Sequence, residues 1–365
     1  MTFPVCIALA FATYLPTQVA PAQIDAIFSG LKSATAPGAA VLVVRNGKPV
    51  FRRGYGVTDL RTRRPIDAQT NFRIASDSKQ FTAACIMLLA REGKLHYDDH
   101  LTDFFPEFPA YGKPITIRNL LNHTSGLPDY EDILTARNPD TPDDKIPQIH
   151  NAEVLKLLEQ QRTAKFPAGS KWEYSNSGYV VLAQIVEKVS GKSFGQFLQE
   201  RIFAPLKMNH TLAYEKGKNE VPHRAYGHTC EKNTCLETDQ SSTSATLGDG
   251  GIYTSLDDLA KWDRALQEHT LLSETEMQPA LTPVQPAGGP ATSPEGPVLY
   301  GFGWHLEPYR GHKRMWHDGE TMGFRGTIQR FPDNNLTVVV LANRSDVNPE
   351  ELALKVADLY FGTKP

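Results

Sequence analysis

The sequence predicts an α/β (α+β) fold, in which an antiparallel sheet is assembled from both ends of the chain and flanked by helices. Two β-rich runs, Ala39 to Val44 and Val50 to Tyr55, surround Asn46-Gly47, a dipeptide that favours a tight hairpin. Helical periodicity dominates the middle of the chain. Three strand-like runs lie near its end: Leu299 to Glu307, Gly326 to Phe331 and Leu336 to Leu341.

Composition narrows the class of protein and of partner. The 365 residues are 40% hydrophobic and 22% charged, as in a soluble globular protein. A net charge of -3 and the lack of any Lys/Arg block argue against nucleic acid or an anionic membrane surface as partner, so we expect a small-molecule or peptide substrate. We expect one domain over residues 23–365, with a sheet lobe at about 23–75 plus 296–365 and a helical lobe at about 76–295. The oligomeric state stays open.

Residues 1–22 have the pattern of an export signal. An apolar run from Val5 to Leu15 is followed by Ala20-Pro21-Ala22, the small-residue pattern of a signal-peptidase site. Because no Lys or Arg precedes the run, an N-terminal extension on a cytoplasmic protein is the alternative. We expect an exported protein, periplasmic or secreted, and no other apolar stretch long enough to span a bilayer.

A first helix is expected near Gln23 to Ser33, and a second begins around residue 76. From Phe81 to Ala90 apolar residues occupy every face, so this second helix must be buried nearly all round, and Gly93 ends it. Ser76, in the N-cap position, and Lys79 lie about one turn apart and can share a face. A buried amine is costly unless its pKa falls, and such a lysine can take a proton from a serine. Ser-x-x-Lys alone is nevertheless a weak pattern.

The later elements follow from periodicity and from helix start and stop signals. Ser255 is expected to cap the helix that follows it, Gly191 to end another, and two Pro-rich stretches, Arg137 to Asn151 and Pro283 to Pro297, to form loops. The expected helices are Pro114 to Leu121, Ala152 to Gln161, Gly178 to Val189, Phe194 to Ile202, Ser255 to Glu268 and Pro349 to Tyr360.

Three polar clusters occur in a fixed order along the chain. They are Ser76-x-x-Lys79, Tyr174-x-Asn176 and His317-x-Gly319. The tyrosine or the histidine alone would more often be a packing residue. In combination the clusters resemble the penicillin-binding-protein and serine β-lactamase superfamily, in the branch of class C β-lactamases, D-alanyl-D-alanine carboxypeptidases, D-aminopeptidases and β-lactamase-like esterases. Supporting matches are Leu120 to Leu127, Phe203 to Met208 and Val340 to Asn343, and the resemblance runs from about Gly38 to the C-terminus.

The resemblance implies a β-lactamase/transpeptidase-like fold and a serine hydrolase that forms an acyl-enzyme on an amide or ester, without metal or cofactor. In this reading Ser76 is the nucleophile, Lys79 accepts its proton, and Tyr174, with its pKa lowered by nearby positive charge, passes a proton to the leaving group. Asn176 holds the substrate amide or Lys79. The remaining expected site residues are His317 as a catalytic residue, Gly319, and the backbone amides of Ser76 and Glu320 as the oxyanion hole.

One departure shifts the expected substrate. Class C β-lactamases carry Lys-Thr-Gly where this chain has His317-Asp318-Gly319, and Asp318 with Glu320 places acidic groups where those enzymes meet a substrate carboxylate. We therefore expect a D-amino-acid-type peptide or a small ester as substrate, with weak or absent β-lactam hydrolysis. The alternatives are a true class C-like β-lactamase and a non-catalytic penicillin- or muropeptide-binding sensor.

Two further patterns offer weaker alternatives. Gly191-Lys192-Ser193-Phe194-Gly195 matches the nucleophile elbow of α/β-hydrolases, which would make Ser193 the nucleophile, but the run before it has helical rather than strand periodicity. Cys230 and Cys235 could close a small loop as a disulfide, in keeping with an oxidising compartment. A zinc site with nearby histidines is less favoured, because the spacing fits no standard pattern.

Overall fold

The computed structural model describes residues 19–232 and 234–361. The predicted leader lies almost wholly outside the described residues. Helix α1 (Pro21–Ile27) is the first element, and a short 3₁₀ turn, Ser29–Leu31, follows it. Among the described residues, no helix combines the length and apolar character needed to cross a bilayer.

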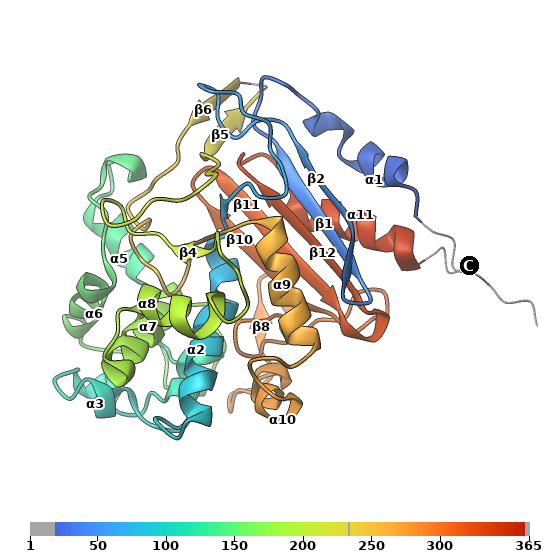
Figure 1. The fold of residues 1–365 in the computed structure, drawn as a ribbon. Coiled ribbons are helices and arrows are strands. Elements are labelled where there is room, and N and C mark those ends of the chain that lie inside the picture. The colour runs from blue at the N-terminus through green and yellow to red at the C-terminus, as the bar shows by residue number, and fades with distance from the viewer. Residues whose placement is uncertain (1–18, 233, 362–365) are drawn as a thin grey trace, which may run out of the picture.

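The central sheet has five antiparallel strands in the order β10-β11-β12-β1-β2, which confirms the predicted fold class (Figure 1). Strand β1 pairs with β12 from Ala39↔Ala342 to Arg45↔Leu336, so the two ends of the chain meet in mid-sheet. Asn46 and Gly47 both have positive φ, as the tight hairpin turn between β1 and β2 requires. The strands are β1 (Ala39–Arg45), β2 (Lys48–Tyr55), β10 (Met315–Thr321), β11 (Phe324–Phe331) and β12 (Leu336–Ala342).

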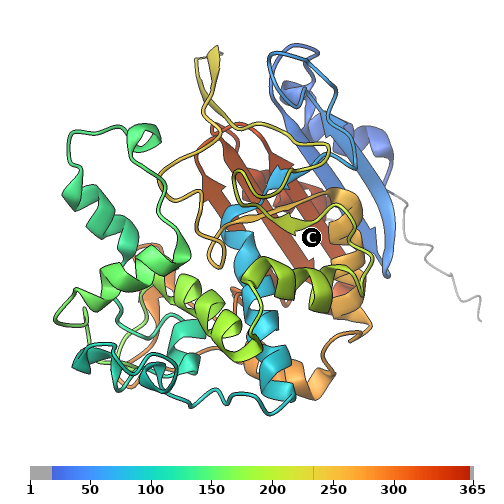
Figure 2. The same cartoon turned by 60° about the vertical axis from the view of Figure 1, so that its left-hand side comes forward.

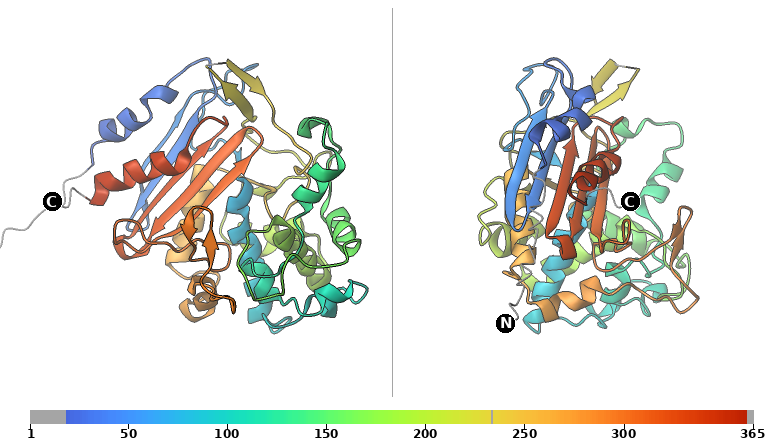
Figure 3. Two further views of the ribbon diagram at one scale, coloured as in Figure 1. Left: turned by 180° about the vertical axis from the view of Figure 1, so that it is seen from behind. Right: turned by 90° about the vertical axis from the view of Figure 1, so that its right-hand side faces the viewer.

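Alternation along the strands gives the sheet two buried faces. On one face, Val41 and Val340 pack with Val356 of helix α11 (Pro349–Phe361), and α1 lies beside that helix (Figure 3, left). On the other face, Leu42 and Leu341 belong to the large core shared with the helices, and α9 (Leu256–Gln267) packs against β1 and β2. A sheet buried on both faces is a rigid support for a site at its edge strand, β10.

Helix α2 (Lys79–Arg91) runs between the sheet and the other helices, and it is buried from Lys79 to Leu89 (Figure 2). Helix α7 (Asn176–Ser190) packs against α2, and α4 (Ile117–Leu121) and α6 (Asn151–Glu159) pack against α7. The other helices are α3 (Leu101–Phe104), α5 (Tyr130–Arg137), α8 (Phe194–Leu198) and α10 (Glu274–Met277). The short strands are β3 (Phe72–Arg73), β4 (Leu212–Ala213), β5 (His228–Glu231), β6 (Thr234–Glu237), β7 (Ile252–Thr254), β8 (Thr292–Ser293) and β9 (Gly296–Pro297).

One predicted strand is wrong. Residues 299–307 form a turn with isolated bridges, Tyr300 to His305 and His305 to Trp316 of β10, and not a continuous strand. Gly303 has φ +74°, and a Cβ there would lie 2.9 Å from the backbone of Gln80, so the chain bends where a continuous strand was expected. The strand that joins the sheet instead is β10, whose His-Asp-Gly sequence has little β propensity.

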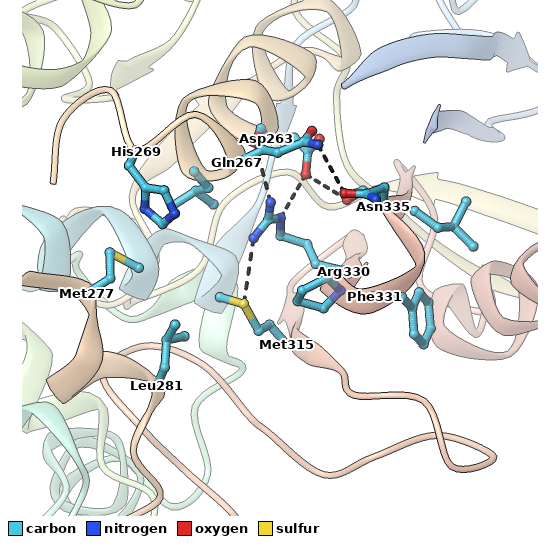
Figure 4. Close-up of a pocket in the computed structure, with 13 residues that line it drawn as sticks. Asp263, Gln267, His269, Met277, Leu281, Met315, Arg330, Phe331 and Asn335 are labelled. Atoms are coloured by element: carbon cyan, nitrogen blue, oxygen red, sulfur yellow. Dashed lines mark hydrogen bonds and ion pairs between the residues drawn. The ribbon is translucent and has the colours of Figure 1, made fainter. Parts of the chain in front are cut away.

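A buried ion pair joins α9 to the sheet. Arg330 Nε donates to Asp263 Oδ1 over 2.7 Å, and Thr337 Oγ1 donates to the same oxygen over 2.6 Å. Both charged side chains are at most 10% exposed, and they border a cavity of about 250 Å³ that Met277, Met315 and other apolar residues line (Figure 4).

Asp263→Ala is expected to lower the free energy of unfolding by about 3 kcal/mol, because it leaves the guanidinium of Arg330 buried without its counter-charge. Urea denaturation measures the effect. The matched control is Glu268→Ala, which removes the exposed pair with Arg264 and should cost less than about 1 kcal/mol. Equal losses in the two variants would show that water entering the cavity solvates Arg330.

Candidate active site

Ser76 lies in a 3₁₀ turn, Ala75–Ser78, immediately before α2. The prediction that Ser76 is the N-cap of this helix is therefore wrong, since Ser78 is the residue that directly precedes α2. Ala75 has φ +45°, an uncommon backbone conformation for a residue with a side chain. Ser76 is partly exposed while both of its neighbours are buried, so its hydroxyl is open to a substrate.

Lys79 is completely buried, and its Nζ lies 3.1 Å from Ser76 Oγ, 2.7 Å from Asn176 Oδ1 and 3.0 Å from the carbonyl oxygen of Asp249. Burial lowers the pKa of this amine to about 8, although nearby carboxylates, first Asp249 and then Glu131, oppose that shift. A neutral amine has two N–H donors and one lone pair. The amide and carbonyl oxygens can only accept, which leaves the lone pair for the hydroxyl proton of Ser76.

Tyr174 and Asn176 are held at the start of α7 by the segment that contains His123. Nδ1 of His123 accepts a hydrogen bond from the backbone N–H of Ser175 over 3.2 Å, and Asp129 Oδ2 accepts one from the N–H of Asn176 over 2.8 Å. The His123 ring also packs against Tyr174, with ring centroids 4.4 Å apart. The stretch from His123 to Asp129 thus holds Tyr174 and Asn176 beside Ser76 and Lys79.

The expected lowering of the Tyr174 pKa is wrong. Lys79 Nζ does lie 4.8 Å from the tyrosine ring centroid. Loss of solvation nevertheless raises the pKa of Tyr174 well above 10, and Ser76 offsets only part of this rise. Tyr174 is therefore a neutral phenol, able to donate a proton but poor at accepting one.

His317 lies near Tyr174, with the two ring centroids 6.1 Å apart. Its Nδ1 lies 2.7 Å from the carbonyl oxygen of Asp318, which can only accept, so the proton is on Nδ1. The Nε2 lone pair is then free to accept from the Tyr300 hydroxyl, 3.2 Å away. Burial lowers the pKa of His317 well below 6.5, and the imidazole is neutral.

The two acidic residues of the strand lie apart. Glu320 is exposed at the rim of the site and pairs with Arg325 over 2.7 Å. The half-buried Asp318 side chain lies on the opposite face of β10 from His317, near Thr327, Arg314 and Glu350, and loss of solvation raises its pKa to about 7. The expectation that Asp318 faces a substrate is therefore wrong.

The space beside Ser76 is small, and a larger groove adjoins it. A cavity of about 80 Å³ is bordered by Ser76, Asn176 and Asp249. A groove of about 620 Å³ adjoins it and shares four lining residues with it, namely Glu131, Thr243, Glu320 and Thr321. Residues from the predicted 137–151 loop, among them Asn138 and Asp143, line the groove, which can hold the remainder of a substrate.

Several residues of the site were missed in the sequence. Asp129, Glu131 and Asp249 surround Lys79, and Tyr300 supports His317. Asp129 could have been recognised in the sequence, because an Asp directly before Tyr130 is a favourable N-cap residue and predicts that α5 begins there. The carbonyl of Asp249 had none, since it reaches Lys79 from 170 residues away.

The structure also shows where the residues of the weaker sequence patterns lie. Ser193 is the exposed N-cap of α8 and follows helix α7, so the nucleophile elbow is wrong because no strand precedes the serine. Cys230 and Cys235 form a disulfide across the β5–β6 ribbon, which confirms that pairing. Over the described ranges, no cluster of three or more His, Cys, Asp or Glu side chains could hold a metal ion.

A family model described as Beta-lactamase matches residues 24–361. The chain belongs to the Beta-lactamase family. Within the family, it is 33% identical to penicillin-binding protein 4* of Bacillus subtilis, over 88% of this chain and 72% of that protein. It is 31% identical to the D-aminopeptidase of Brucella ovis, over 90% of this chain but only 60% of that protein's length.

The fold agrees with this membership. The structure of a penicillin-binding protein from Bacillus halodurans aligns with a TM-score of 0.76 and 27% identity, over 92% of this chain and 98% of that one. The relatives of this chain in the Beta-lactamase family thus include penicillin-binding proteins and D-aminopeptidases. These relatives support its assignment to the serine hydrolases.

Proposed function

We propose that this protein is a serine hydrolase that forms an acyl-enzyme on Ser76 and cleaves peptides or amides of D-amino acids, or small esters. The observation that carries the proposal is the position of Lys79, whose amine contacts Ser76 Oγ and two groups that can only accept hydrogen bonds. Once burial has released its proton, the amine can keep an N–H bond to each of these two acceptors and direct its lone pair at the serine, the condition for general-base activation of a nucleophile.

The steps follow from the geometry. Lys79 takes the hydroxyl proton as Ser76 Oγ bonds to the substrate carbonyl carbon, and the backbone N–H groups of Ser76 and Glu320 donate to the oxyanion. Tyr174, a neutral phenol, gives its proton to the leaving nitrogen or oxygen and regains one from the Lys79 ammonium. Water then attacks the ester on Ser76 and gives a proton to Tyr174 as Tyr174 passes its own to the neutral Lys79, and the Lys79 ammonium protonates Ser76 Oγ as the acid leaves.

Charge in the groove favours a substrate with a free amino group over one with a carboxylate. Glu131 lines both the cavity and the groove, and so does Glu320, whose charge is balanced by its pair with Arg325 of the groove, so Glu131 is the acid that carries this preference. Arg73, the cation that borders the Ser76 cavity, already donates to Ser244 Oγ and to the carbonyl of Gly250. This balance is in keeping with the D-aminopeptidase relative and with weak β-lactam hydrolysis.

A substrate panel tests the proposal. D-alanine p-nitroanilide, its N-acetyl derivative, a D-alanyl-D-alanine peptide, p-nitrophenyl acetate and nitrocefin would be compared by kcat/KM. We expect the free-amine anilide to exceed its acetylated form at least about tenfold. Fastest turnover of nitrocefin would instead indicate a class C-like β-lactamase. Binding without turnover of any compound would indicate a sensor.

Glu131→Gln is expected to lower kcat/KM for D-alanine p-nitroanilide about tenfold and to leave p-nitrophenyl acetate within twofold, because only the anilide carries an ammonium group for the carboxylate to bind. Burial raises the pKa of Glu131 to about 7, so the carboxylate is lost below that pH. The parent's preference for the free amine should fall below pH 7, and Glu131→Gln should show no such fall. An unchanged preference in the variant would remove Glu131 from recognition.

A further inference from the structure

The residue after the nucleophile is an acid with no visible role in the reaction. Asp77 is 0% exposed, and within the described residues neither of its carboxyl oxygens has a hydrogen-bond partner. Buried polar groups in native proteins are nearly always satisfied, so an orphaned carboxyl beside a nucleophile requires an explanation. The proposed acylation steps do not use it.

The Asp77 carboxyl lies against a part of the sheet where two neighbouring strands have no side chains. Gly319 of β10 and Gly326 of β11 are directly opposed in the strand register. A Cβ built on Gly319 would lie 2.1 Å from the carbonyl oxygen of Ile74 and 3.1 Å from Asp77 Oδ2, and one on Gly326 would lie 3.2 Å from the same carboxyl oxygen. The two opposed glycines thus leave the space in which the Ile74 carbonyl and the Asp77 carboxyl lie against the sheet, and β10 continues from Gly319 directly into Glu320.

The charged groups around Asp77 favour its neutral form. Lys79 acts on it from α2 and Asp318 from the other face of β10, while the contacts of Gly326 beyond Asp77 are with Val340 and Leu341 of β12, which are not titratable. Burial first and Asp318 second raise the pKa of Asp77 well above its usual value, and Lys79 opposes them. A neutral carboxyl can lie against the sheet at modest cost, but an ionised one cannot.

We propose that Asp77 is a positioning residue with a built-in alkaline limit: uncharged, it seats the Ser76 turn on β10 and so sets the distance between the two oxyanion amides. When it loses its proton, a negative charge lies beneath the position of the developing oxyanion and opposes acylation. The inference rests on the proposed function, since it concerns the amides of Ser76 and Glu320. An uncharged residue of similar size at position 77 could seat the Ser76 turn equally well, but the seating would then not depend on pH.

The decisive comparison is between Asp77→Asn and the parent, using the pre-steady-state burst of p-nitrophenyl acetate from pH 6 to 11. Asparagine keeps the shape and cannot ionise. We expect it to retain the acylation rate at pH 7 within about threefold and to lose the alkaline decline that the parent shows. An alkaline decline of the same midpoint in both proteins would overturn the proposal, as would a parent without a decline.

A double-mutant cycle tests the seating itself. Asp77→Ala and Gly326→Ala should each lower kcat at least about tenfold with KM within threefold, because one leaves a void and the other crowds the carboxyl. In the double variant the Asp77 carboxyl is gone, so the methyl group of residue 326 has room. Its kcat should therefore be at least about fivefold higher than that of Gly326→Ala. Additive losses would overturn the seating role. If a variant fails to fold, as circular dichroism would show, the asparagine comparison alone decides.

The inference can fail separately from the proposed function. Labelling of Ser76 by a fluorophosphonate probe, followed by intact mass, reports the nucleophile whatever residue 77 does. A parent that labels while Asp77→Asn keeps the alkaline decline overturns the Asp77 role alone. A parent that does not label at Ser76 overturns both.

Discussion

Ser76→Ala is expected to abolish covalent labelling by fluorophosphonate or penicillin-type probes and to lower kcat/KM on the best substrate of the panel by at least about 10³-fold. Without Oγ no acyl-enzyme can form, and the oxyanion amides alone can supply only residual catalysis. The substitution removes a single oxygen at a partly exposed position, so the fold should be unaffected. Far-ultraviolet circular dichroism and thermal unfolding would check this.

The matched control for this prediction is Ser193→Ala, which changes an exposed helix N-cap in the rejected elbow motif. It should label as the parent does and lose at most about 1–2 kcal/mol of stability through the missing cap. Intact mass spectrometry after probe treatment separates the two variants in one experiment. Labelling that persists in Ser76→Ala and vanishes in Ser193→Ala would reverse the assignment of the nucleophile.

The sequence was most informative where local chemistry decides the structure. The Asn46-Gly47 turn, the Gly191 helix end and the Ser255 N-cap all occur as predicted, because each depends on a few neighbouring residues. The three ordered motifs likewise predicted that Ser76 and Lys79 come together with Asn176, which the structure shows. Their chemical roles stay predictions until variants are measured.

Long-range packing explains what was missed. Strand β10 enters the sheet through pairing with β11 and in spite of its sequence, whereas 299–307 has apolar residues but bends at Gly303. Nothing in the sequence around Asp77 marks it as buried, and its burial against the sheet becomes visible only through the opposed glycines of two strands more than 240 positions away. The predicted lowering of the Tyr174 pKa was wrong for the same reason, because the effect of burial on that pKa outweighs the effect of the nearby Lys79 amine.

The last prediction concerns the general base. Lys79→Met should lower the acylation rate at least about 10³-fold, and in the parent that rate should rise about tenfold per pH unit up to a pH near 8, as the neutral amine becomes populated. Burst kinetics with p-nitrophenyl acetate between pH 5 and 9 measures both. The asparagine variant of residue 77 should keep this acid limb.

Stability distinguishes loss of the base from loss of the fold. The pKa of Lys79 is about 8 in the folded protein and about 10.4 in an unfolded chain, so between these values the unfolded state binds more protons. The parent should therefore gain stability as the pH rises through that window, and below pH 8 it carries the full penalty of about 3 kcal/mol.

Methionine removes that penalty together with the hydrogen bonds to Asn176 Oδ1 and Asp249, so Lys79→Met should unfold at pH 7 within about 2 kcal/mol of the parent while it fails to acylate. A stable, inactive variant assigns the base to Lys79. Parent-like acylation in Lys79→Met would require another proton acceptor. Tyr174, the other expected proton carrier beside Ser76, would be a poor one, because burial keeps its phenol protonated.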